Sequence, residues 1–295
     1  LTFAMFVPML SGGLNLSIIG TANLTGLFMA WLLIQYVPAD ASTATQLMWL
    51  VIALLGAALI AVIIGTLTGL MIARIGAHPI LVTLGSMTII SGIGVYLTKG
   101  AALSGMPPIV RSMGSAVVMG IPIPMIIFVV ASLLLALILG KTRLGKTIYM
   151  CGSNINATWF SGIRTDRVMI AIYSISSLLC VLAGLIMMSR FNSARMGYGD
   201  SYLLLTVLAI VLGGTNPFGG VGKVSHVFCA LLVLQVIATG LSLLGVSLHF
   251  NLAVWGITLI FALAFKFFKE KWKAKRAMKN NRLKHFSKMA IGKTE

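Results

Sequence analysis

A stretch near the middle of the chain, 140–147, matches a nucleotide-binding motif. It reads GKTRLGKT and fits the pattern G-x-x-x-x-G-K-[ST] at every constrained position. In such a loop, backbone N–H groups surround the β-phosphate, the lysine reaches the phosphate oxygens and the hydroxyl holds Mg²⁺. A genuine loop of this kind joins a short strand to a helix in a soluble α/β domain. Here the apolar run 122–139 precedes it, and no strand ending in a metal-binding Asp completes a site. We expect Lys141, Arg143 and Lys146 to form a basic collar at the end of a membrane span instead.

Other side chains that could do chemistry are few and scattered. The acidic residues lie in predicted loops, at loop edges or in the tail: Asp40, Asp166, Asp200, Glu270 and Glu295. None of the four histidines pairs with a carboxylate at helical spacing, and the three cysteines show no spacing typical of a metal site. No GxSxG, HExxH or intramembrane Asp pair is present. The sequence therefore predicts no catalytic residues, no metal site and no cofactor bound by this chain.

The chain as a whole is far more apolar than a soluble protein. Hydrophobic residues make up 59% and charged residues 9% of its 295 residues, with a mean hydropathy of +1.03. About 20 apolar residues are needed to span a bilayer as helix. We expect an all-α polytopic membrane protein with eight to nine transmembrane helices visible, some of them broken or short. The predicted spans are 14–37, 46–73, 79–98, 122–139, 168–189, 202–212, 224–244 and 251–265, with 1–10 as the remnant of an earlier span.

Lysine and arginine residues give the direction of these spans, because basic residues that flank spans are retained on the cytoplasmic side. Five of the 22 lie in 141–167 and eleven in 266–293. Four predicted crossings separate the two segments, so both can be cytoplasmic. Eighteen basic residues then face the cytoplasm and four face outward. We expect a transmembrane domain at 1–265, with a cytoplasmic loop at 140–167, and a basic cytoplasmic tail at 266–295.

The formal net charge of +17 follows largely from this topology. The tail sequence FKFFKEKWKAKRAMKNNRLKHFSK is suited to attraction by anionic membrane lipid. We therefore expect membrane lipid, and no nucleic acid, among the partners of the chain.

Two stretches break the apolar pattern with glycines, amides and hydroxyls: SGGLNLSIIGTANLTG at 11–26 and LGGTNPFGGVGK at 212–223. Such breaks occur in membrane helices where the backbone is buried in protein or lines a cavity. The residues offered are uncharged and suit a neutral polyhydroxylated solute. Close helix packing explains the small residues at least as well. Asn15 and Asn23 favour a functional role more strongly, because buried amides require partners. The candidate substrate-pathway residues are Gly12, Gly13, Asn15, Ser17, Asn23, Gly213, Gly214, Thr215 and Asn216.

The loop after the basic collar contains a short amphipathic segment, bounded by Asn154 and Gly162. Its apolar positions Ala157, Phe160 and Ile163 recur at helical spacing among polar neighbours. Such a helix lies on a membrane surface or inserts into a groove of a partner protein. The residues alone leave both alternatives open.

Four stretches in order resemble one family, the membrane permeases of ribose-type ABC importers, which also serve other simple sugars and autoinducer-2. They read GGLNLSII at 12–19, PILVTLGSMTIISGI at 79–93, GKTIYMCGSNINATWFSGI at 145–163 and IVLGGTNPFGGVGK at 210–223. The resemblance covers nearly the whole chain. Asn15 stands where many relatives carry Asp, and the family has about ten helices with roughly fifty residues before the first motif.

The resemblance implies the biological setting. The chain would pair with a second permease, identical or different, and bind an ABC ATPase subunit that uses ATP and Mg²⁺. An extracytoplasmic solute-binding protein would deliver the solute. The location implied is the bacterial plasma (inner) membrane. The short amphipathic segment would be the helix that couples to the ATPase, through Asn154, Ala157, Phe160, Ser161, Gly162 and Ile163.

The expected function is thus a non-enzymatic permease subunit of an ABC importer that forms the pathway for a neutral sugar or sugar-like solute. One alternative is a secondary transporter or channel for a small neutral solute that works alone. The absence of acids from the predicted spans argues against ion coupling in such a protein. A second alternative, an integral-membrane enzyme or assembly factor, would require a reactive cluster that the sequence does not show.

Overall fold

The computed structural model describes residues 1–38, 41–246, 250 and 252–264. The chain divides into two compact units, Leu1–Ile237 and Ala238–Glu295, and each is described by itself. The predicted basic tail at 266–295 lies outside the described residues.

Long apolar helices dominate the described residues and confirm a polytopic all-α membrane fold. Six are long and apolar enough to cross a membrane. They are α2 (Ile18–Tyr36), α3 (Thr43–Ile75), α4 (Pro79–Thr98), α6 (Ile123–Lys141), α9 (Thr165–Phe191) and α11 (Val224–Leu243). Two shorter apolar helices are α10 (Tyr202–Leu212) and Leu252–Ala264.

Local sequence signals fix where these helices begin and end. The Ser42 side chain caps α3 by accepting from the Thr45 amide, and Gly76 ends the helix with a φ of 71°. A proline occupies the first turn of α4 and of α6, where its missing N–H costs nothing. The predicted span 14–37 was wrong at its start, because α2 begins at Ile18 after a non-helical segment.

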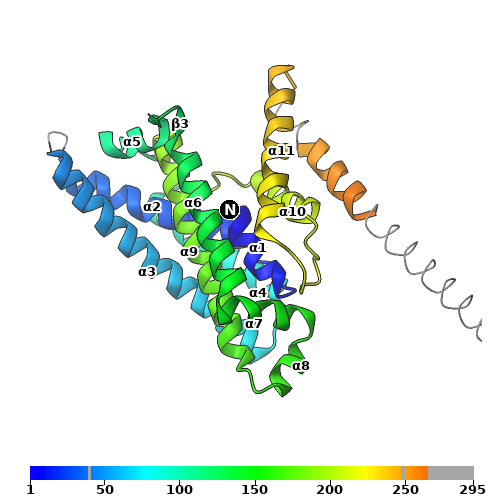
Figure 1. Cartoon of the computed structure of the whole chain (residues 1–295). Helices are drawn as coiled ribbons and strands as arrows, with labels where there is room; N and C mark the ends of the chain where they lie inside the picture. Colours follow the sequence, from blue (N-terminus) through cyan, green and yellow to red (C-terminus); the bar gives the residue numbers. More distant parts are fainter. Residues whose placement is uncertain (39–40, 247–249, 251, 265–295) are drawn as a thin grey trace, which may run out of the picture. The chain divides into compact units, whose positions relative to one another are not determined.

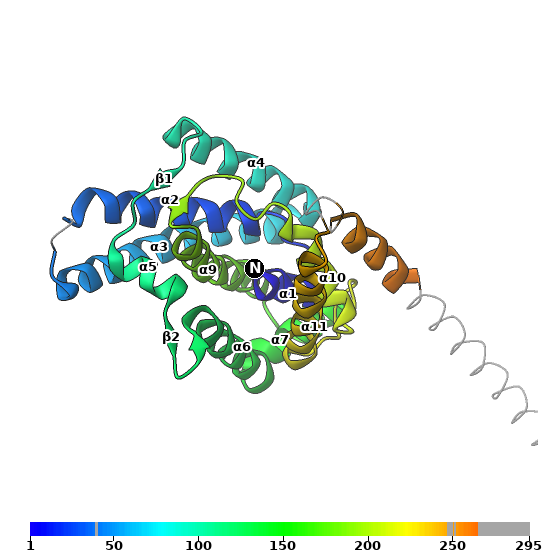
Figure 2. The same cartoon turned by 90° about the horizontal axis from the view of Figure 1, so that it is seen from above.

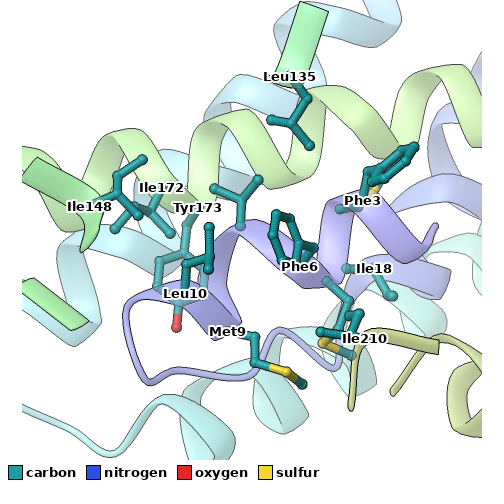
Figure 3. Close-up of a cluster of buried hydrophobic side chains, with 14 of the residues drawn as sticks. Phe3, Phe6, Met9, Leu10, Ile18, Leu135, Ile148, Ile172, Tyr173 and Ile210 are labelled. Atoms are coloured by element: carbon teal, nitrogen blue, oxygen red, sulfur yellow. The ribbon is translucent and has the colours of Figure 1, made fainter. Parts of the chain in front are cut away.

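The centre of the first unit is formed by α9 and the short helix α1 (Thr2–Leu10), with α2, α3, α4 and α6 around them (Figures 1 and 2). All nine residues of α1 are buried. Helix α1 therefore lies inside the first unit rather than at its edge. Figure 3 shows Phe3, Phe6 and Leu10 of α1 packed with Leu135 of α6 and Tyr173 of α9.

Small residues bring α3 and α9 into close contact. A Cβ on Gly65 would lie 2.6 Å from the Tyr173 carbonyl oxygen, and one on Gly69 would lie 2.7 Å from the Ile170 Cα. Glycines at such sites let helix backbones approach in a membrane, where packing rather than the hydrophobic effect holds helices together. Gly65 and Gly69, which lie outside the two predicted breaks, therefore serve close packing of this helix pair.

Connections at the two ends of the first unit differ in structure (Figure 1). At one end lie α5 (Pro108–Ser115), the antiparallel pair β1 (Leu103–Ser104) and β4 (Ser193–Ala194), and the hairpin of β2 (Val117–Val118) and β3 (Ile121–Pro122). At the other end lie two helices, α7 (Arg143–Ser153) and α8 (Ile155–Phe160).

The stretch 140–147, which matches the nucleotide-binding motif, is helical except at Thr142, where the chain bends between two helices. It joins the end of α6 to the start of α7. The Thr142 hydroxyl donates to the Ile138 carbonyl at 2.6 Å and accepts from the Gly145 amide at 3.1 Å. This hydroxyl therefore caps a helix, and the residue before the turn is helical rather than the end of a strand.

Candidate functional site

The first predicted break, 11–26, is non-helical only over residues 11–17, between α1 and α2, because residues 18–26 belong to helix α2. Gly12 has a φ of +81°, which favours glycine, and the amides of Ser11 and Gly13 both donate to the Pro8 carbonyl. A Cβ on Gly13 would lie 2.6 Å from the Tyr173 hydroxyl oxygen. Figure 3 shows this oxygen pointing toward the chain that follows Leu10. The break thus lies against the central helix α9.

Asn15 sits inside this break in a buried hydrogen-bond network, with only 1% of its surface exposed. Its amide nitrogen Nδ2 donates to the Ser176 hydroxyl at 2.8 Å, and that hydroxyl donates to the Ala4 carbonyl at 2.6 Å. Its oxygen Oδ1 accepts from the amide and the hydroxyl of Ser17, at 3.1 and 2.7 Å. Asn15 and Ser17 therefore hold α1, α2 and α9 together, as expected for a buried amide that needs partners. A role for either residue in the solute pathway stays a prediction.

The second glycine break is the loop between α10 and α11. A Cβ on Gly213 would lie 2.9 Å from the Val227 Cα, so α10 ends in close contact with the start of α11. Within the loop, Asn216 Oδ1 accepts from the Phe218 amide and its Nδ2 donates to the Gly219 carbonyl. The Asn216 side chain thus shapes its own loop.

The two breaks meet, and they meet at the end of α7. We call this meeting point the glycine junction: residues 10–13, 152–153 and 218–222. The Gly220 amide donates to the Leu10 carbonyl at 2.9 Å. A Cβ on Gly219 would lie 2.7 Å from the Gly12 amide nitrogen and 2.8 Å from the Gly152 carbonyl oxygen. Sequence reasoning identified both breaks but not Gly152, which lies in the last turn of α7.

Asn23 is not part of this cluster. It lies on α2 beside Gly26, where a Cβ would be 3.5 Å from the Gly184 carbonyl oxygen of α9. The space around it is small and is lined by Gly184, Met187 and Tyr198, among others. The structure thus separates Asn23 from Gly12 and Gly13.

The predicted amphipathic segment is the helix α8, directly after the junction. Asn154 caps it, with Oδ1 accepting from the Ala157 amide at 3.0 Å, and Gly162 follows its end with a φ of +79°. The Ser161 hydroxyl donates to the Ala157 carbonyl. Ala157 and Phe160 are exposed, and Ile163 is half-buried beyond the helix.

The exposed apolar surface of α8 is larger than predicted. Trp159 is 61% and Phe160 80% exposed, and their rings contact edge to face at 5.0 Å between centroids. Ile155 is also exposed. Sequence reasoning missed Trp159 and Ile155, although both are large apolar residues within the predicted segment.

A cleft of about 620 Å³ separates α8 from the turn between α3 and α4. Gly12, Gly13 and Phe218 line it on the junction side, and Gly76 and Pro79 line it on the side of that turn. Residues from α7, α8 and the start of α9 complete the lining, among them Asn154 and Asp166. Two of the four candidate pathway glycines, Gly12 and Gly13, therefore share one cleft with the candidate coupling helix.

Charged side chains in the six long helices occupy only first or last turns, within the described part of the chain. They are Arg74, Lys141, Asp166, Arg167 and Arg190. Among these same described residues, no three His, Cys, Asp or Glu side chains gather as a metal site would require. The arrangement offers glycine backbone, amides and hydroxyls, which can bind or pass a neutral solute.

Comparisons with known proteins place this geometry in a family. A family model described as "Branched-chain amino acid transport system / permease component" matches residues 2–263. The ribose import permease protein RbsC of Bacillus subtilis (strain 168) is 36% identical over 197 residues, 66% of this chain and 61% of that protein. RbsC of Escherichia coli (strain K12) is 31% identical over 263 residues, 88% of this chain and 78% of that protein.

A third relative is the D-allose transport system permease protein AlsC of Escherichia coli (strain K12). It is 28% identical over 259 residues, 88% of this chain and 76% of that protein. No solved structure gives a significant match. Because the family model covers nearly the whole chain, and a named ribose permease aligns along most of it, the chain belongs to the family of transport-system permease components.

Proposed function

We propose that the chain is the membrane-spanning permease subunit of an ABC importer and forms the pathway for a neutral sugar or sugar-like solute. The relatives named above are permeases for ribose and D-allose. The observation that carries the proposal is the glycine junction, where both broken segments meet the base of the exposed helix α8.

The absence of charge along the described spans supports transport that is not coupled to a proton or cation gradient. Proton- or cation-coupled transporters place ionisable groups inside the membrane, where their cost is tolerated for function. The described spans carry charge only at their ends. The energy for transport therefore comes from another chain, the ATPase, which binds ATP and Mg²⁺ while this chain binds no cofactor.

Helix α8 is the proposed contact with that ATPase, through Asn154, Ala157, Phe160, Ser161, Gly162 and Ile163. An amphipathic helix with exposed aromatic residues suits a hydrophobic groove on a partner. Trp159 and Phe160 supply the large anchors that such a contact needs.

The pathway residues are proposed as a set with two parts. Gly12 and Gly13 lie at the cleft beside α8, and Gly213 to Asn216 begin the second break. Asn15, Ser17 and Asn23 are buried in this conformation, so contact with a solute would require helix movement. A permease that alternates between two conformations provides such movement.

The proposed setting is the bacterial inner membrane, with a second permease copy or homologue and an extracytoplasmic solute-binding protein. The end of the first unit that carries α7 and α8 faces the cytoplasm in this proposal, as does the C-terminus. The excess of basic residues on that side supports this orientation.

Affinity purification in mild detergent tests the proposal. The tagged chain should retain an ABC ATPase, and a solute-binding protein encoded with it should bind a neutral sugar in a ligand screen. Reconstituted into proteoliposomes, the complex should take up that sugar only with ATP. A stable complex without an ATPase, or uptake without ATP, would favour the alternative of a transporter or channel working alone.

A further inference from the structure

The glycine junction leaves no space between three segments far apart in the chain. A Cβ on Gly152 would collide with the Leu10 carbonyl oxygen and lie 2.5 Å from the Gly220 amide nitrogen. A Cβ on Gly12 would lie 2.9 Å from the Phe218 carbonyl oxygen. Backbone therefore packs directly on backbone at this point. Such contacts cannot adjust by side-chain rotation, so a shift of one segment must displace the others or break the contact.

Two hydrogen bonds tie the same segments. The Gly220 amide donates to the Leu10 carbonyl, and the Tyr149 hydroxyl of α7 donates to the Gly222 carbonyl at 2.8 Å. The first bond joins the second break to the end of α1, and the second bond joins the same break to α7. The end of α7 is thus tied to the second break by a hydrogen bond, and it lies against Leu10 through the close approach at Gly152.

Helix α8 continues this connection with a single residue between helices. Asn154 ends α7 and caps α8 at once, since it is the C-cap of one and the N-cap of the other. On the opposite side, the 620 Å³ cleft separates α8 from the turn between α3 and α4. Helix α8 is therefore joined to the junction through Asn154 and separated from the turn between α3 and α4 by the cleft.

We propose that the glycine junction moves as one rigid body with α8, so that Gly12, Gly152 and Gly219 are positioning residues that transmit movement of α8 to both broken segments. The inference rests on the proposed function, because it takes α8 as the contact with the ATPase. It adds which part of the permease follows α8: the breaks at 11–17 and 213–223.

The first test is Gly219→Ala in the complete transporter, with its ATPase and solute-binding protein, in proteoliposomes. Gly219 has a φ of +94° and no room for a Cβ, so the substitution should open the junction. The ATPase should still co-purify, because the surface of α8 is unchanged. Solute-stimulated ATP hydrolysis and uptake should fall about tenfold or more, the size of a typical coupling between sites.

The matched control is Gly100→Ala. Gly100 has a φ of +76° and nothing within 4 Å of an added Cβ, so it imposes a similar backbone strain away from the junction. Uptake by this variant should stay within about twofold of the unmodified transporter, because surface changes away from special contacts have small effects. Normal coupling in Gly219→Ala would overturn the proposal.

The second test does not depend on Gly219→Ala folding. Tyr149→Phe removes only the hydrogen bond from α7 to the Gly222 carbonyl and adds no atom to the junction. Solute-stimulated ATP hydrolysis and uptake should fall about fivefold, the lower end of a typical coupling between sites, while the ATPase still co-purifies. Tyr173→Phe is the control, because the Tyr173 hydroxyl has no hydrogen-bond partner among the described residues. Unchanged coupling in Tyr149→Phe would overturn the inference.

These results separate the inference from the proposed function. If the unmodified chain retains no ATPase and shows no ATP-dependent uptake, the proposed function fails. If it retains the ATPase and imports solute, but Gly219→Ala or Tyr149→Phe remains fully coupled, only the rigid junction fails.

Discussion

Two tyrosine hydroxyls near the glycine junction differ in their hydrogen bonding. The Tyr149 hydroxyl donates to the Gly222 carbonyl. The Tyr173 hydroxyl is fully buried and finds no hydrogen-bond partner among the described residues. Tyr149→Phe should lower the free energy of unfolding by about 1 kcal/mol, while Tyr173→Phe should leave it unchanged or raise it. Thermal unfolding of the two detergent-purified variants compares them directly. A larger loss in Tyr173→Phe would contradict the assignment.

Ser176 is the residue on which the Asn15 network depends. It accepts from Asn15 and donates to the Ala4 carbonyl, so its removal leaves two buried groups without a partner. Ser176→Ala should destabilise the protein by about 1–3 kcal/mol. Ser189→Ala on the same helix is the control, since the Ser189 hydroxyl donates only to the Ile186 carbonyl of its own helix. Equal melting temperatures for the two variants would refute the network's contribution.

Residue types predicted part of this site. Gly12, Gly13 and Asn15 stand out because glycine pairs and amides are rare in an apolar run, and a buried amide needs partners. The identity of the partner was beyond the sequence, because Ser176 lies 161 residues away and resembles many other serines. The same holds for Gly152, whose importance comes only from the two loops that close on it.

At the scale of elements, α8 should behave as a docking surface whose large apolar residues dominate. Replacing Trp159 and Phe160 together with alanine should reduce the ATPase retained on purification by about tenfold or more, the effect expected for central aromatic anchors. Met119→Ala is the control, since Met119 is 99% exposed in the hairpin at the opposite end of the unit. Quantitative immunoblotting of the purified complex measures the retained ATPase. Full retention by the double variant would show that the ATPase binds elsewhere.

The end of α8 provides a separate prediction. Gly162 has a φ of +79° with open space around it, so Gly162→Leu strains the backbone where α8 ends without a steric clash. The variant should insert in the membrane at normal levels but hydrolyse ATP without matching uptake. Parallel measurements of ATP hydrolysis and uptake in proteoliposomes give the ratio. A ratio equal to that of the unmodified transporter would contradict a coupling role for this residue.

The helices that could be predicted from the sequence are those formed by clearly bounded apolar runs. The predicted spans 79–98 and 202–212 coincide with α4 and α10, because apolar runs bounded by proline, glycine or charge leave little freedom. The pairing of β1 with β4 was not predictable, since Leu103 and Ala194 come from connections separated by two membrane helices. Helix α7 was missed because its mixture of basic, glycine and apolar residues shows no clear span.

At the scale of the whole molecule, two of the described apolar helices are too short to settle the topology by length. At 1.5 Å per residue, the eleven residues of α10 extend about 16 Å, roughly half of the hydrocarbon thickness. The number of membrane crossings after the central loop therefore depends on whether α10 and Leu252–Ala264 cross the membrane. If both cross or neither does, the number is even, and the central loop and the C-terminus lie on the same side. If only one of the two helices crosses, they lie on opposite sides.

Labelling of one introduced cysteine at a time in spheroplasts decides the orientation of the first unit. Cys151 and Cys180 are buried, and burial raises the pKa of the Cys151 thiol, so Cys229→Ala removes the exposed native thiol. In that background, Ser112→Cys on α5 and Asn156→Cys on α8 place exposed thiols at opposite ends of the unit. A membrane-impermeant maleimide should label position 112 in intact spheroplasts and position 156 only after permeabilisation, because basic residues concentrate beside α8. The reverse pattern would place α8 outside the cell, out of reach of any ATPase, and would overturn both the orientation and the proposed coupling.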